Sequence, residues 1–127
     1  MKQILPVLLS FFLLASFKPA ISIDEVVTAI KAGNATAVAG YFDNTVEITL
    51  PDKGNSYSKS QAEIVLKDFF ANNTVKGFTI IHKGQNAGYQ YCIGTLITKN
   101  GSFRTTIQMK QKKDNTQVVQ ELRFEGM

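Results

Sequence analysis

Apolar positions recur every three or four residues in the first half of the chain, which predicts helices there. The segment 22–34, "SIDEVVTAIKAGN", places four apolar residues on one helix face: Ile23, Val26, Val27 and Ile30. A serine or an aspartate can cap the start of this helix, and Gly33-Asn34 is a typical end. A second, shorter helix is predicted for residues 34–42.

A third and longer helix is predicted for residues 58–73, "SKSQAEIVLKDFFANN". Its apolar residues fall on one face, which should be buried: Ala62, Val65, Leu66, Phe69 and Phe70. Before it, residues 45–50 alternate apolar and polar side chains, as a half-buried strand does, and Pro51 ends that run. Residues 52–58 have the composition of a tight connection or a small hairpin.

From residue 75 onward the pattern is that of strands. Four runs are rich in β-branched and aromatic residues: residues 77–84, 88–98, 101–113 and 117–125. Short turn sequences separate them, and Asn100-Gly101 is a strong hairpin signal. Strands joined by such turns pair antiparallel. The whole pattern therefore predicts an α+β domain, with helices on one face of a curved antiparallel sheet.

Three stretches near the C-terminus, "FTIIHKG", "YCIGTLITKNGSFR" and "LRFEG", resemble a family of small exported bacterial proteins of unknown function. That family has a nuclear transport factor 2-like (cystatin-like) fold, and the order of the predicted elements resembles this fold too. The resemblance implies a cone, with two short N-terminal helices and a third, longer helix on a curved antiparallel sheet. It implies one domain over residues 21–127 but no activity, because the fold is shared by enzymes, immunity proteins and plain binding modules.

The first twenty residues have the composition of an export signal. Lys2 supplies a positive start, an apolar run extends from Ile4 to Phe17, and small residues lie near its end. The run is shorter than the roughly 18 residues of a spanning helix. We therefore expect residues 1–20 to be a cleaved signal peptide and the protein to be periplasmic or extracellular. The mature domain should not insert stably into a membrane.

Charge and cysteine content narrow the kinds of partner and cofactor. Of the formal net charge of +4, two charges (Lys2 and Lys18) lie in the predicted signal, which leaves +2. Because the basic residues are scattered, nucleic acid is not an expected partner. The local cluster "KQKKD", residues 110–114, falls at a hairpin turn. Cys92 with His82 is too small a set for a zinc site, so no metal and no cofactor are expected.

Cys92 is the single cysteine, so an internal disulfide is excluded. It alternates with Tyr91 and Ile93 in a predicted strand, where no helix N-terminus or cationic neighbour would activate its thiol. We expect it to pack as a small apolar residue, while catalysis and an intermolecular disulfide remain alternatives. Gly94 nearby suggests a bend in the sheet or the close approach of another backbone.

A pocket in the mouth of the cone is the site that the resemblance implies, since enzymes of this fold place a base and a hydrogen-bond donor there. The weak catalytic candidates are His82, Asp43 and Tyr41. Because side chains alternate between the two faces of a strand, His82 is expected on the same face as Phe78 and Ile80. We expect the ligand-binding set to be Tyr41, Phe70, Phe78, Ile80, His82 and Tyr91. A bulge or a one-residue slip would exchange inner and outer residues.

The opposite face of the predicted sheet carries polar residues. Arg104 points away from the apolar residues of its strand, as do Glu121, Arg123 and Glu125 across the last hairpin. They form either a solvated ladder of charge pairs or a partner surface, and the resemblance implies homodimers through this outer face. The function that we predict is an exported, non-catalytic module that binds a small apolar ligand or a protein. The alternative is an isomerase or hydro-lyase.

Overall fold

The computed structural model describes residues 22–127, so the predicted signal peptide lies outside the described part of the chain. The elements follow in the predicted order: α2 (Ile23–Lys31), α3 (Ala35–Ala39), β1 (Phe42–Leu50), β2 (Lys53–Ser58), α4 (Lys59–Asn72), β3 (Val75–Asn86), β4 (Tyr89–Thr98), β5 (Gly101–Gln111) and β6 (Gln117–Gly126). Within residues 22–127, no helix combines the length and the apolar character needed to cross a membrane.

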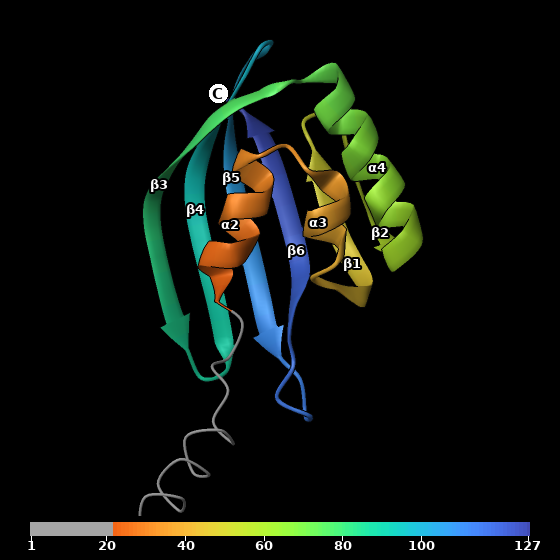
Figure 1. The fold of residues 1–127 in the computed structure, drawn as a ribbon, viewed down its shortest axis with the longest axis vertical. Helices are drawn as coiled ribbons and strands as arrows, with labels where there is room; N and C mark the ends of the chain where they lie inside the picture. The colour runs from red at the N-terminus through yellow and green to blue at the C-terminus, as the bar shows by residue number, and fades with distance from the viewer. Residues whose placement is uncertain (1–21) are drawn as a thin grey trace, which may run out of the picture.

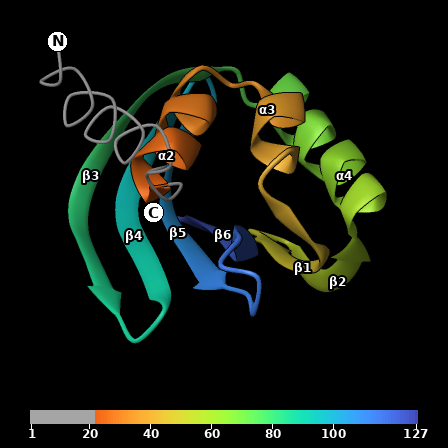
Figure 2. The same cartoon turned by 60° about the horizontal axis from the view of Figure 1, so that its bottom comes forward.

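One sheet, in the order β2-β1-β6-β5-β4-β3, curls around the helices. All three helices of the described region lie on its concave side, with α2 over β3 and β4 and α4 over β1 and β2 (Figures 1 and 2). The prediction of a wholly antiparallel sheet is wrong at one place, because β1 pairs with β6 in parallel. A parallel pair needs a long connection, and here everything from β2 to β5 lies between the two strands.

The core lies between the helices and the concave face of the sheet. Its apolar residues come from the predicted faces of the helices and from alternate strand positions. Phe124 of β6 is fully buried and stacks on Phe69 of α4, with ring centroids 4.6 Å apart. The Phe70 ring meets the Phe124 ring edge-on, with centroids 6.3 Å apart, and the Phe103 ring meets the Phe69 ring with centroids 5.3 Å apart. These four rings join α4 to β5 and β6.

Gly94 of β4 is closely approached by the neighbouring strand β3. A Cβ atom at this position would lie 2.5 Å from Cζ of Phe78 and 2.6 Å from the backbone oxygen of Thr79, which is far inside van der Waals contact. The absence of a side chain therefore lets the Phe78 ring lie close against Gly94. The close approach predicted for this glycine is confirmed.

A β-bulge interrupts β3 in its middle. The pairing with β4 passes from Ile80 opposite Gly94 to His82 opposite Ile93, so Ile81 is an extra residue. Before the bulge, Phe78 and Ile80 face the helices. After it, the alternation is reversed, so His82 lies on the outer face with Ile93. The prediction that His82 shares a face with Phe78 and Ile80 is therefore wrong, because the bulge shifts the phase.

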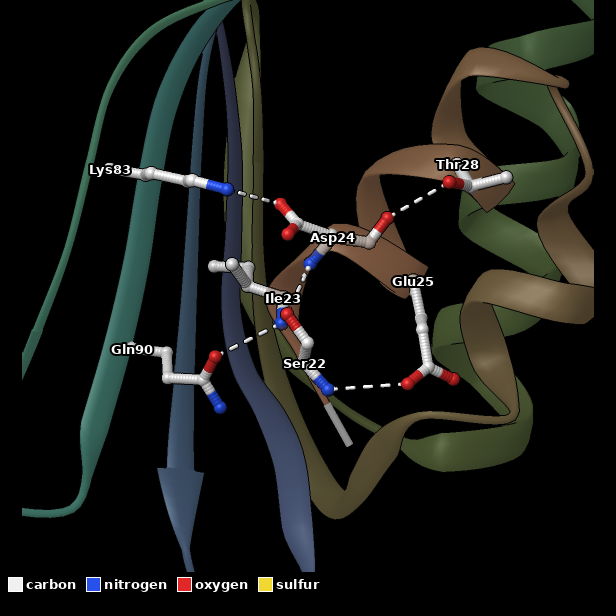
Figure 3. A network of polar contacts seen from close by, with 7 residues as sticks. All are labelled: Ser22, Ile23, Asp24, Glu25, Thr28, Lys83 and Gln90. Carbon is white, nitrogen blue, oxygen red and sulfur yellow. Dashed lines mark hydrogen bonds and ion pairs between the residues drawn. The ribbon is translucent and has the colours of Figure 1, made fainter. Parts of the chain in front are cut away.

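The same shift turns Lys83 toward the helices, opposite the buried Cys92. Its Nζ atom lies 2.6 Å from Oδ1 of Asp24 in the first turn of α2, as Figure 3 shows. That turn is also closed by a capping box. The Ser22 hydroxyl accepts a hydrogen bond from the backbone N–H of Asp24, and the Glu25 carboxylate accepts one from the backbone N–H of Ser22. The ion pair between Lys83 and Asp24 therefore connects the edge strand β3 to α2.

Candidate functional site

The predicted pocket residues are distributed over both faces of the sheet. His82 and Tyr91 form a pair on the outer face, where Nε2 of His82 lies 2.8 Å from the Tyr91 hydroxyl. The Tyr91 ring covers Gly84, at which an added Cβ would lie 2.6 Å from the hydroxyl oxygen. No hydrogen bond or ion pair joins His82 to a carboxylate within residues 22–127. The pair therefore consists of an imidazole and a phenol, without a carboxylate to orient the imidazole.

The other predicted residues have separate surroundings. Phe70 and Phe78 are buried in the core, and Ile80 faces the helices at the sheet edge with 41% of its surface exposed. The Tyr41 hydroxyl lies 3.5 Å from Oε1 of Glu25, at the first turn of α2. The structure thus brings His82 together with Tyr91 but does not gather the six residues around one cavity. Their role in ligand binding stays a prediction.

Asp43, the third catalytic candidate, faces the β5–β6 hairpin. Its carboxylate accepts hydrogen bonds from the backbone N–H of Asn44 at 2.8 Å, from Gln120 at 3.3 Å and from Lys112 at 3.3 Å. Burial raises the pKa of Asp43, but these hydrogen bonds together outweigh it and lower the pKa below its ordinary value. Such a carboxylate stays ionised and is a poor general base.

We expect this lowered pKa to make Asp43 stabilise the fold at neutral pH and not in acid. A folded-state pKa below the unfolded one gives stability above the unfolded value of about 3.9, and the stability is lost as pH falls through the folded value. Asp43→Asn should therefore lower the urea midpoint at pH 7 and have a smaller effect near pH 3. An equal effect at both pH values would contradict the assignment. The exposed Asp52→Asn is the control.

A groove of about 530 Å³ lies between α4 and the β1–β2 turn. Phe69, Phe103 and Leu50 form part of its wall, and Asp52, Lys53 and Asp68 also line it. The sequence reading missed this groove. The signal that could have found it is Ile64 and Asp68, which lie four residues apart on α4 beside the predicted buried stripe, next to a Pro51-Asp52 turn.

The outer face of the sheet is uncovered by the helices (Figure 2). It carries an apolar band along β3 and β4, formed by Ile81 (61% exposed), Ile97 (40% exposed) and the half-buried Ile93 and Tyr91, with the paired Thr79 and Thr95 between Ile93 and Ile97. Beside the band lie the predicted charges of β5 and β6. Arg123 contacts Glu121 at 2.8 Å and Glu125 at 4.0 Å along its own strand.

Cys92 is completely buried on the helix side of β4, and burial raises the pKa of its thiol. A thiol that is both buried and protonated is a weak nucleophile. This agrees with the prediction that Cys92 packs as a small apolar residue. Residues 22–127 also contain no group of three or more histidine, cysteine, aspartate or glutamate side chains placed to hold a metal ion.

Comparisons with known proteins identify relatives in both sequence and fold. The family model described as "Domain of unknown function (DUF4783)" matches residues 23–125. A DUF4783 family protein from Bacteroides fragilis is 30% identical, with a TM-score of 0.77 over 84% of this chain and 99% of that one. A second, from Bacteroides uniformis, is 28% identical, with a TM-score of 0.78 over 82% of this chain and 95% of that one. No curated protein matches.

More distant structures share the fold alone. The protein named "Rd1NTF2_04 with long sheet" is 19% identical, with a TM-score of 0.64 over 80% of this chain and 94% of that one. Its match confirms the predicted nuclear transport factor 2-like cone of helices on a curved sheet, with the parallel β1–β6 pair as the correction.

Proposed function

Because this chain belongs to the DUF4783 family, a family whose description assigns no activity, we propose a function from its own surface. The protein is an exported, non-catalytic interaction module, and it pairs with a second copy of itself through the outer face of the sheet. The observation that carries this proposal is the band of Ile81, Ile93 and Ile97, which leaves two large isoleucines open to solvent on a face without helices.

Exposed apolar residues that are gathered in one band are the usual mark of an interaction surface. Ile97 lies over Gly77, with Cδ1 3.9 Å from the position of an added Cβ, so the band extends to the edge strand without a covering side chain. Ile81 owes its position to the bulge, which places it and His82 together opposite Ile93. The bulge thus adds an apolar side chain to the outer face.

The charges beside the band favour a second copy as the partner. The outer positions of β1, β5 and β6 carry three acidic and three basic residues: Glu47, Glu121, Glu125, Arg104, Lys110 and Arg123. In a two-fold dimer a patch meets itself, so a patch of one sign would repel its copy. A balanced patch can instead pair acidic with basic residues across the two-fold axis. A partner with a strong net charge of one sign would find no surface of opposite net charge on this face.

The enzyme alternative receives less support from the geometry. His82 and Tyr91 lie on the outer face, while Asp43 is held by Lys112 and Gln120 beside another hairpin. A general acid–base pair must reach one substrate, and these groups do not share a cavity. In the groove beside α4, a small apolar ligand would meet Asp52, Lys53 and Asp68, which add charge to the lining.

Replacing Ile81 with aspartate should weaken self-association by about tenfold or more, because the symmetric interface would bury two new charges. Sedimentation equilibrium over a range of protein concentrations measures the change. The matched control is Ile64→Asp, since Ile64 is similarly exposed at 67% but lies on α4. A wild-type protein that stays monomeric at high concentration, or an equal effect of the two variants, would refute the dimer.

A further inference from the structure

A small polar pocket lies at the end of the cone where the β3–β4 and β5–β6 hairpins meet the start of α2. Its volume is about 260 Å³. The lining consists of uncharged residues, among which glutamine predominates: Ser22, Gln85, Gly88, Tyr89, Gln90, Gln111 and Gln117. The pocket is distinct from the isoleucine band and from the groove beside α4, so it is independent of the proposed dimer.

The hairpins bring the glutamines together in pairs. Gln85 lies opposite Gln90 at the end of β3 and β4, and Gln111 lies opposite Gln117 at the end of β5 and β6. The Gln111–Gln117 pair is the last one before its turn, and the Gln85–Gln90 pair is one position further from its turn. The sequence therefore contains the signal, two glutamines flanking each of two hairpin turns, although it does not show that the two turns meet.

Hydrogen bonds join the side-chain amides into one chain. The backbone N–H of Ile23 donates to Oε1 of Gln90 at 3.0 Å, which Figure 3 shows at the first turn of α2. Gln90 then donates to Gln117 at 3.1 Å, and Gln117 donates to Gln111 at 3.1 Å. Gln111 donates in turn to Asn115 at 2.7 Å. The chain holds the amides in defined orientations before any ligand arrives.

These fixed amides retain capacity for a ligand. A primary amide has two N–H donors and an oxygen with two lone pairs. In this chain of hydrogen bonds, the side chains of Gln117 and Gln111 each donate one hydrogen bond and accept one, so each amide keeps one N–H donor and one lone pair of its oxygen. Gln117 is only 7% exposed, which places a polar side chain in a largely desolvated wall. Hydrogen bonds made there gain strength from the low local dielectric.

The chemistry of this lining selects a neutral ligand rich in hydroxyl groups. A charged ligand would find no counter-charge among the lining residues, and an apolar one would leave the remaining donor and acceptor of Gln111 and Gln117 unused. A hydroxyl both donates and accepts, so neighbouring hydroxyls match the donor and acceptor of one amide. The volume is below the roughly 300–1,000 Å³ of pockets for drug-sized ligands, which suits a single sugar ring. An extended peptide would need a longer groove with room for side chains.

We propose that this pocket, walled by Gln85, Gln90, Gln111 and Gln117, binds a neutral saccharide, either as a free sugar or as the end of a glycan.

The test is a titration of ¹⁵N-labelled protein with glucose, galactose and N-acetylglucosamine, followed by the side-chain amide resonances of the glutamines. At least one sugar should shift the signals of Gln85, Gln111 and Gln117 in a saturable manner, with a Kd on the order of 1 mM. Maltose and cellobiose form a second arm. Tighter binding of a disaccharide indicates a glycan end, and equal or weaker binding indicates a free sugar.

Two variants locate the site. Gln111→Glu keeps the acceptor that Gln117 uses but removes the amide donors, and Gln85→Ala removes an exposed wall residue. Each should weaken sugar binding about tenfold, whereas Gln61→Ala, an exposed glutamine on α4, should leave it unchanged. The proposal is overturned if no sugar shifts these signals. It is also overturned if triglycine or phosphate shifts them while the sugars do not, or if all three variants bind alike.

Discussion

Replacing Phe124 with alanine is expected to lower the free energy of unfolding by about 3–5 kcal/mol. The side chain is fully buried, and its ring stacks on Phe69 at 4.6 Å and meets Phe70 at 6.3 Å. Its removal would leave a cavity between α4 and β6 and would end both ring contacts, which contribute beyond the loss of buried area. Urea unfolding followed by circular dichroism measures the change.

Two further variants show whether the loss of stability in Phe124→Ala comes from the lost ring contacts or from a general failure to fold. Typical domains are stable by only about 5–15 kcal/mol, so the alanine variant is expected to be marginal. Phe124→Leu keeps most of the volume and should cost less than about 1.5 kcal/mol. Phe103→Ala should also cost less than Phe124→Ala, because Phe103 is only half-buried. A loss below 1 kcal/mol for Phe124→Ala, by the same scale, would mean that the ring cluster is not the centre of the core.

A methyl group added at Gly94 should destabilise the protein by about 1–3 kcal/mol, the usual cost of overpacking. The new Cβ would meet Cζ of Phe78 at 2.5 Å and the backbone oxygen of Thr79 at 2.6 Å. The ring could turn aside, but the backbone oxygen belongs to the paired strand and cannot move without breaking the ladder. The unfolding free energy of Gly94→Ala in urea tests this expectation.

Two other glycines supply matched controls for Gly94→Ala. At Gly126 no atom lies within 4 Å of an added Cβ, so Gly126→Ala should change stability by no more than about 0.5 kcal/mol. At Gly84 the nearest atoms belong to the Tyr91 side chain, which can rotate outward. Gly84→Ala should therefore cost less than Gly94→Ala while it separates Tyr91 from His82. If the three variants are equally stable, the close approach of Phe78 and Thr79 does not require a glycine at position 94.

The order of the elements could be predicted because each is specified locally. The periodicity of 22–34 and 58–73, the serine caps and the Asn100-Gly101 turn act within a few residues of chain. The parallel pairing of β1 with β6 could not be predicted in this way, because it joins residues more than seventy positions apart, such as Phe42 and Val119. It depends on how the whole sheet curls and not on either strand alone.

The candidate site was harder to predict because it depends on strand phase. "FTIIHKG" contains no glycine or proline at the position of the bulge, so regular alternation was the natural interpretation. The one extra residue, Ile81, moves His82 to the outer face, where it meets Tyr91. The burial of Cys92 could be predicted, since β4 keeps a regular alternation throughout. The meeting of four glutamines depends on two hairpins that are distant in sequence.

The bulge and the inward-facing Lys83 also bear on how the protein avoids aggregation. β3 is one of the two terminal strands of the sheet, and a long unpaired strand edge is a template on which other chains can build cross-β fibrils. The bulge breaks the regular spacing of its N–H and C=O groups, and an incoming strand would have to match that break. A lysine that points inward and is held by Asp24 adds a charge where a stacked strand would need to bury one. Both features disfavour fibril growth through this edge.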